Sequence, residues 1–365
     1  MREPVAFDPT APVLSARTAL MHDRNTQLHT VVFTLHWVLN VVALHVVNKI
    51  RREADAGDSK RSTPGPRPST PMLLARHHAL FFAQVMMYCH LDAAYPAPVL
   101  LSLPFQAYAG AFTMGVLDFY LCPPAADGKD PRRQLCVWKV TQGAWLWLAC
   151  DWILHFCAGS WLGASLGGRE LVLRSQVHQL GSGMASATRF LAEEYGRFLF
   201  WMLGAGLCSD FFFSPLHRLT HRLAYGRVHK QHHAFTSRLT SLVLFHGHAL
   251  DDFLMPLTTV GGGLCVWGFI HAIGSATGWQ STWQYYMVAF FLPYSHASEA
   301  RLASLLVPGL PDSLNFIAYH RRHHIEPSRN FGLVLPTDML WDKLLGVRTV
   351  MLSDGDATID ANKCK

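Results

Sequence analysis

The chain has 365 residues with a formal net charge of +6; 50% of them are hydrophobic and only 15% are charged. Ordinary soluble domains carry about 25% charged residues, so this composition favours a membrane protein. The sequence contains no stripe of Lys and Arg interleaved with aromatic residues, which argues against a nucleic-acid partner. Its eight cysteines are scattered and form no CxxC pair, which favours reduced thiols over a disulfide framework.

Seven apolar runs are candidates for membrane spans, since about 20 residues cross the hydrocarbon core. In chain order they are residues 28–47, 80–88, 99–121, 144–166, 198–216, 253–273 and 283–305. With seven spans, the basic segments 49–70, 122–139, 217–252 and 306–365 all fall on one side, which the positive-inside tendency assigns to the cytosol. The alternative is that one or two of these runs are re-entrant.

The predicted fold is all-α, a multi-span membrane helical bundle with a cytosolic helical cap. Residues 1–190 are expected to form an N-terminal membrane region with about four candidate spans. Within it, the polar and basic segment 49–70 is expected to be a flexible loop. Residues 191–350 are expected to form a catalytic domain, and residues 351–365 a polar tail. The N-terminus shows no cleavable signal peptide.

Three histidine clusters stand out among the 21 histidines. The first is an HxxxH pair, His217 and His221, and the other two are HxxHH motifs at 229–233 and 320–324. On a helix, residues three or four apart share a face, so each cluster can present two or three imidazoles to one object. Neutral imidazole suits zinc, copper, nickel and iron, and eight nitrogens exceed the needs of one tetrahedral site. Two transition-metal ions are the simpler interpretation.

These motifs resemble those of the fatty acid hydroxylase and sterol desaturase superfamily of integral membrane di-iron enzymes, over roughly residues 200–350. Asp210 with His217-Arg218 resembles the family's "D…HRxxH", and Lys230 completes "HKxHH". The segment 245–251 resembles "YxHPxE", with Ala249 in place of Pro and Asp251 in place of Glu. Residues 341–346 resemble the closing "WDxLFG".

The resemblance implies ten metal ligands, because it adds His248 from the segment 245–251 and His296 from a late apolar run. They are His217, His221, His229, His232, His233, His248, His296, His320, His323 and His324. His246 competes with His248 for its role. Four acids are candidates to orient the imidazoles by accepting hydrogen bonds from their N–H groups, namely Asp210, Asp251, Asp252 and Glu299.

The implied activity is an oxygen-dependent hydroxylation or desaturation of a membrane lipid, using two iron ions and O2. The lipid is left open between a sterol, a sphingoid base and a fatty acyl chain. No haem, flavin or ferredoxin motif is present, so electrons would come from an external carrier such as cytochrome b5. That carrier would dock on a basic cytosolic surface that includes Arg218, Arg222, Arg227, Arg321 and Arg322.

The resemblance also implies the endoplasmic reticulum, with the metal site facing the cytosol. The rival interpretation from another class is a histidine-rich membrane metal transporter or metal-binding protein. Transporters usually spread intramembrane ligands over many spans, whereas these histidines are expected to gather at one membrane face.

Overall fold

A computed structural model describes residues 24–57, 69–73, 75, 112–120, 135–150, 184–236, 239–255, 294–307 and 309–350. These residues are helical or irregular, and none of them lies in a strand, which confirms the all-α prediction. Several expected features lie outside the described residues: the run 80–88, most of the run 253–273 and the tail 351–365.

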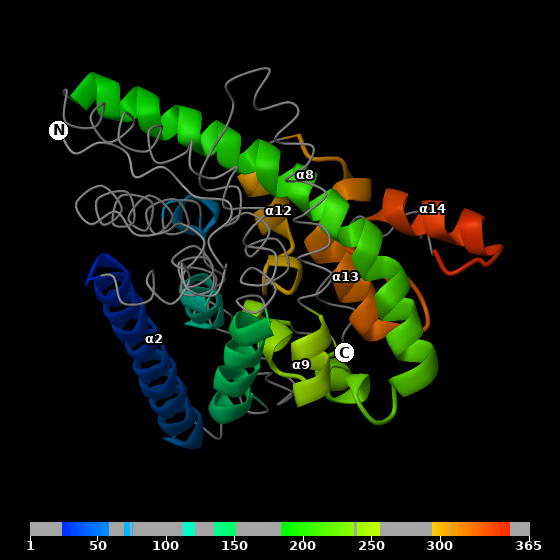
Figure 1. The fold of residues 1–365 in the computed structure, drawn as a ribbon, viewed down its shortest axis with the longest axis horizontal. Helices are drawn as coiled ribbons and strands as arrows, with labels where there is room; N and C mark the ends of the chain where they lie inside the picture. The colour runs from blue at the N-terminus through cyan, green and yellow to red at the C-terminus, as the bar shows by residue number, and fades with distance from the viewer. Residues whose placement is uncertain are drawn as a thin grey trace, which may run out of the picture.

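The helices follow the chain as a blue-to-red series in Figure 1. The α-helices are α2 (Arg24–Gly57), α8 (Met184–Ala224), α9 (Ala249–Leu254), α12 (Arg301–Leu306), α13 (Phe316–Ile325) and α14 (Leu335–Leu345). Residues 112–120 and 137–150 are helical as well. Three short 3₁₀ helices complete the set: η1 (His229–Ala234), η2 (Ser241–Phe245) and η3 (Asp312–Leu314).

Helix α2 contains a stretch, Thr30–Lys49, that is long and apolar enough to cross a membrane, judged by length and composition alone. It overlaps the expected span 28–47. Among the described residues no other helix meets the same test. The multi-span bundle therefore stays a prediction.

Two expectations about individual segments were wrong. Helix α2 continues through Gly57, so residues 49–57 are helical and not part of a loop, because no glycine or proline interrupts this stretch before Gly57. The run 283–305 is not one continuous span either. Its helix stops after Ser295, and α12 begins only at Arg301. Side chains from elsewhere in the fold hold the backbone between them, as described below.

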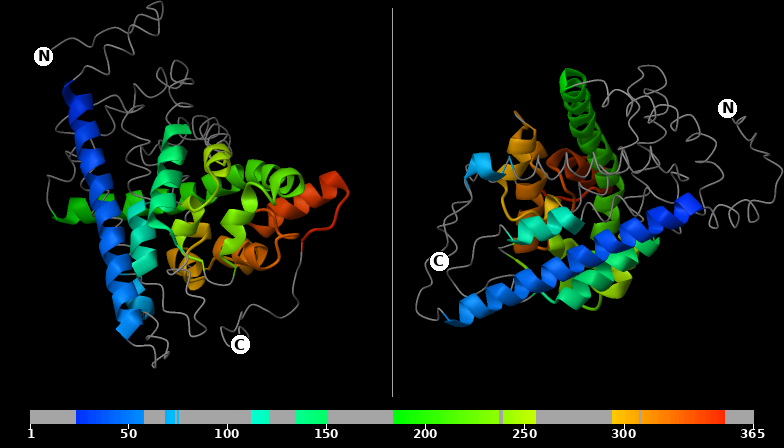
Figure 2. Two further views of the ribbon diagram at one scale, coloured as in Figure 1. Left: turned by 90° about the horizontal axis from the view of Figure 1, so that it is seen from below. Right: turned by 90° about the vertical axis from the view of Figure 1, so that its left-hand side faces the viewer.

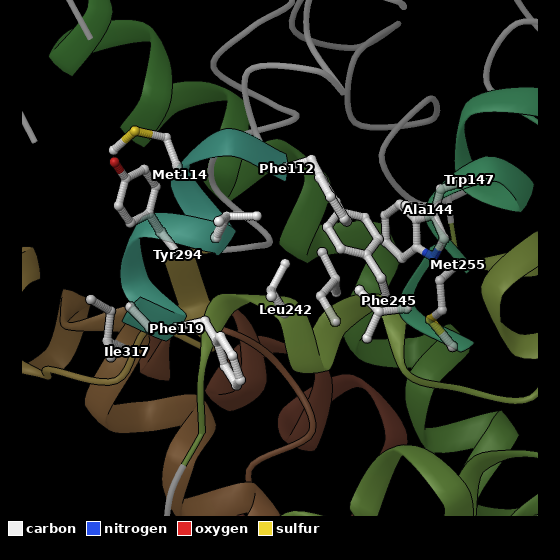
Figure 3. Close-up of a cluster of buried hydrophobic side chains, with 14 of the residues drawn as sticks. Phe112, Met114, Phe119, Ala144, Trp147, Leu242, Phe245, Met255, Tyr294 and Ile317 are labelled. Atoms are coloured by element: carbon white, nitrogen blue, oxygen red, sulfur yellow. The ribbon is translucent and has the colours of Figure 1, made fainter. Parts of the chain in front are cut away.

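The N-terminal helices share a hydrophobic core with the histidine-bearing part of the chain (Figure 3). Phe245 at the end of η2 is fully buried between Phe112, at a centroid distance of 6.1 Å, and Trp147, at 5.9 Å. Gly115 allows this approach, because a Cβ there would lie 2.6 Å from the Cδ2 of Leu242. Helices 112–120 and 137–150 therefore fix the position of the segment that follows η1.

Helix α8 runs as one element from Met184 through the apolar stretch 198–216 and the first histidine pair to Ala224. Helix α14 lies beside α8, and the two stay adjacent in both further views (Figure 2). Gly346 ends α14 in the left-handed conformation, with φ of 65°, which glycine adopts without a steric penalty.

Candidate metal centre

Nine of the ten histidines that the resemblance implied as ligands converge in two neighbouring groups. Within each group, the nitrogen atoms that could bind a metal lie within 4.8 Å of one another. Histidine group 1 consists of His217, His221, His229, His233 and His323. Histidine group 2 consists of His232, His296, His320 and His324. The groups adjoin, since the rings of His233 and His324 are 4.5 Å apart.

Of the two spacings that the sequence offered, the histidines of each HxxHH motif pair by i,i+4 and not by i,i+3. In α13, His320 and His324 both belong to group 2, while His323 belongs to group 1. The motif at 229–233 does the reverse: its first and last histidines join group 1, and His232 joins group 2. Each HxxHH motif thus supplies both groups, because its middle histidine joins one group while its first and last histidines join the other.

Hydrogen bonds at the outer nitrogens determine which atoms face inward. His217 Nδ1 lies 2.6 Å from the Phe331 carbonyl oxygen, and His229 Nδ1 lies 2.7 Å from Asp251 Oδ2. Those oxygens accept, so each Nδ1 donates its proton and Nε2 of the neutral ring presents a lone pair. The two Nε2 atoms are 2.7 Å apart. A cation shared by the two Nε2 atoms would relieve the repulsion between their lone pairs.

The same arrangement recurs at two further histidines. His323 Nδ1 donates to the Arg329 carbonyl at 2.6 Å, and His324 Nδ1 donates to the Phe235 carbonyl at 2.9 Å. His324 Nε2 is buried without a hydrogen-bond partner among the described residues. A buried nitrogen of this kind is costly unless it is bound, so this donor set fits a metal ligand.

Burial favours the uncharged form of most of these imidazoles. Desolvation, followed by the repulsion of neighbouring histidines, lowers the pKa of His221 to about 2 and holds the pKa values of His217, His232, His320 and His324 well below the usual range. For His323, burial outweighs the bond to Arg329 and lowers the pKa to about 3. Neutral imidazole is the form that binds metal, so no proton has to be displaced near neutral pH.

The segment 329–334, here termed the carbonyl clamp, supplies two of the carbonyl acceptors. Two buried carboxylates accept hydrogen bonds from the backbone N–H groups of this segment. Asp210 accepts from the backbone N–H of Leu333 at 2.6 Å and of Val334 at 3.1 Å. Asp338 accepts from the N–H of Gly332 at 2.8 Å. The predicted candidate Asp210 therefore touches no imidazole, and acts on group 1 only through this backbone.

Asp338 also joins the helices around the clamp. Its carboxylate accepts from Ser214 Oγ in α8 at 2.5 Å and from Tyr319 Oη in α13 at 2.9 Å. Arg218 donates to Asp338 at 3.0 Å and to Asp342 at 2.7 Å. The Arg218 side chain is only 10% exposed, so it ties α8 to α14 and is not available at the surface for an electron carrier.

A further network, missed in the sequence, holds the segment that carries His296. Asp118 is buried in helix 112–120 and accepts from Ser298 N–H at 3.1 Å, from Ser298 Oγ at 2.6 Å and from Ser241 N–H at 2.8 Å. Arg321 donates to the carbonyls of Ala297 and Ser298 at 2.9 and 2.8 Å. These bonds are the physical reason that the run 283–305 breaks after Ser295. An acid inside the apolar run 99–121 was the signal that could have revealed Asp118.

The remaining predicted residues fall into different surroundings. Asp251 reaches His229, as noted, but Asp252 contacts no described histidine by a hydrogen bond. The Asp252 carboxyl fits between two glycines, since a Cβ on Gly247 or Gly143 would lie 2.6 or 2.9 Å from its oxygens. Burial, then the neighbouring Asp251, raises the pKa of Asp252 to about 8. Glu299 is partly buried and pairs with Arg301 at 3.1 Å.

His248 is not brought to either group. It is exposed at the N-terminus of α9, where its Nδ1 accepts from the Leu250 N–H at 3.2 Å. The helix that starts at Ala249 turns the His248 side chain outward, and proline is absent there. Its competitor His246 is buried, with its ring edge-on to Phe235 at 4.9 Å, yet it also lies outside both groups.

The comparison with known families covers the residues that build this centre. Residues 202–347 match the fatty acid hydroxylase family, and this segment contains all nine grouped histidines together with the carbonyl clamp. No curated protein and no solved structure matches the chain. The segment 202–347 is therefore similar to the fatty acid hydroxylase family, which is part of the sterol desaturase and fatty acid hydroxylase superfamily.

Proposed function

We propose that this protein is a di-iron, oxygen-dependent hydroxylase or desaturase of a membrane lipid. The observation that carries the proposal is the pair of adjoining histidine groups, in which nine imidazoles face one another. The match of residues 202–347 to the fatty acid hydroxylase family supports an oxidoreductase that acts on lipids. The substrate is a sterol, a sphingoid base or a fatty acyl chain.

The donor set fits two iron ions. Group 1 offers five imidazoles and group 2 offers four, and no described carboxylate or thiolate belongs to either. All-nitrogen sites of this kind suit iron, copper, nickel or zinc and disfavour magnesium and calcium. When bound, two iron ions would supply the activation of dioxygen that attack on an unreactive C–H bond requires.

The protein's own contribution is to orient the ligands and to exclude water. The carbonyls of Phe331, Arg329 and Phe235 fix three ring orientations and leave each Nε2 free for the metal. Apolar rings cover the nitrogens from outside. Phe213 lies 4.6 Å from the ring of His217, and Phe331 lies 5.2 Å from the ring of His221. Both phenylalanines are buried, so they protect the reacting groups from bulk water.

Electrons would enter beside His221, the member of group 1 that is not fully buried. Exposed Arg222 and Arg227 follow it, while Arg218 and Arg321 are engaged in the interior contacts described above. We place the docking surface of an external carrier such as cytochrome b5 on this side. We place the enzyme in the endoplasmic reticulum membrane, with this surface in the cytosol.

The test is lipid and sterol profiling of cells that express the protein, its His324→Ala variant or no protein, together with iron analysis of the purified chains. His248→Ala is the matched control, because it removes an imidazole that lies outside both groups. We expect one oxidised lipid to appear with the unaltered protein and with His248→Ala, and to be absent with His324→Ala.

Two results would contradict the proposal. If His324→Ala retained full product formation, group 2 would not be catalytic. If the lipid profile stayed unchanged while the metal content of the cells shifted, the protein would be a metal transporter or metal-binding protein instead.

A further inference from the structure

Helix α14 is amphipathic, but its polar side faces the interior of the protein and its apolar side faces outward. Its inward side is polar, with Thr337, Asp338 and Asp342 buried. Its outward residues include Met339, Leu340, Leu344 and Leu345, which are 52, 44, 62 and 53% exposed. A helix on a water-facing surface shows the opposite arrangement, with apolar residues inside and polar residues outside.

The inward polar residues are fully used, so the reversal is not a packing fault. Asp338 binds Ser214, Tyr319 and Gly332, as described for the clamp. Asp342 accepts from Arg218 at 2.7 Å and from Thr349 N–H at 2.6 Å, where the chain turns back after Gly346. These contacts fix the rotation of α14 about its axis, and they leave its apolar side facing outward.

The charges on the outward side have one sign. Both acids of α14 point inward, whereas Lys343 and the following Arg348 are exposed. An apolar stripe flanked by exposed basic residues and free of acids complements an anionic lipid surface. This combination distinguishes a membrane contact from an interface with a second copy, in which these basic residues would lack a counter-charge on an identical surface.

The apolar side of α14 continues onto α8. Trp341 Nε1 donates to the Phe211 carbonyl at 2.9 Å, and their rings are 5.1 Å apart. Phe211, Phe212 and Leu207 on α8 are each between 37 and 39% exposed. Tryptophan is favoured at the boundary between lipid and water. Figure 1 shows α14 beside α8 at the edge of the molecule.

We propose that α14 is an interfacial membrane helix, which lies on an anionic bilayer with Leu340 and Leu344 inserted among the lipids. This adds a lipid contact to the expectation for residues 306–365, which the sequence placed on the cytosolic side. The proposal does not depend on the oxygenase activity. It does give the membrane a physical connection to the metal centre, since Asp338 on the opposite side of α14 holds the carbonyl clamp.

The test uses the full-length chain in vesicles of phosphatidylcholine with phosphatidylserine. A photoreactive benzoylphenylalanine replaces Leu344 in one preparation and Glu326 in the other. Glu326 is the matched control, because it is exposed and acidic at the end of α13. Mass spectrometry then identifies whether light attaches a lipid or a second copy of the chain. We expect several-fold more lipid adduct at position 344 than at position 326.

A cross-linked dimer through position 344, or equal lipid labelling at both positions, would overturn the proposal. A second variant tests the charges separately. Changing both Lys343→Glu and Arg348→Glu is expected to reduce the lipid adduct at position 344 in vesicles with phosphatidylserine, and to have less effect in phosphatidylcholine alone. Undiminished labelling of this variant in the anionic vesicles would contradict the electrostatic part.

Discussion

The two histidine groups differ in where their support comes from. Group 1 is oriented by neighbours within the family-matched segment, namely the carbonyl clamp and Asp251. Group 2 depends at His296 on a backbone segment held by Asp118, which lies in the N-terminal region outside the matched residues. The matched segment therefore supplies every grouped histidine but does not by itself position all of them.

The largest effect should follow from removing a central ligand of either group. We expect His217→Ala and His320→Ala each to abolish product formation, because both rings are fully buried among the other ligands. Iron bound per chain, measured by elemental analysis, should fall in both variants. If one of them kept full activity and iron, the group to which it belongs would not be part of the centre.

Asp118→Ala should separate the two groups. It leaves the N–H groups of Ser298 and Ser241 and the Ser298 hydroxyl without their acceptor, and each such loss costs about 1–3 kcal/mol. We expect partial loss of iron, with a lower unfolding temperature and little activity. Asp118→Asn keeps one acceptor oxygen, so its iron content should lie between those of the unaltered protein and Asp118→Ala. Equal iron content in all three proteins would show that His296 needs no support from the N-terminal region.

Asp251→Asn tests the side-chain support of group 1. The carboxylate orients His229 and strengthens it as a ligand, and loss of such a partner typically reduces metal affinity or activity by about 10–100-fold. Competition with an iron chelator measures the affinity. Glu299→Gln is the control acid, because Glu299 pairs with Arg301 and belongs to neither histidine group. A similar loss in both variants would indicate a general charge effect.

Gly332→Ala should give the smallest of these effects, through the carbonyl clamp. The added Cβ would lie 3.1 Å from both Asp210 carboxylate oxygens and 3.2 Å from Asp338 Cγ. Both carboxylates are buried and accept hydrogen bonds, so they have little room to move. We expect a destabilisation of about 1–3 kcal/mol, with weaker iron binding. Gly196→Ala in α8 meets no atom within 4 Å and should stabilise the helix by up to about 1 kcal/mol. Thermal unfolding with iron analysis distinguishes the two.

Most of the grouped histidines could be predicted from residue types and their spacing. Eight histidines in three short motifs were enough to predict a two-metal centre, and the structure brings all eight together with His296. His248 was the exception, since the motif placed it in the ligand set while the start of α9 turns it outward. The sequence spacing also did not say which histidine belongs to which group, because the division depends on how η1 and α13 face each other.

The sequence by itself determined the helical class and the chemistry of the donors. These follow from local properties, namely helix-compatible residues, apolar runs and imidazoles at fixed spacing. Tertiary structure alone decided the roles of Asp118, the carbonyl clamp and the reversed sides of α14. Each of these depends on hydrogen bonds between residues far apart in the chain, such as Asp118 with Ser298 or Ser214 with Asp338. Spacing within a single helix carries no information about such partners.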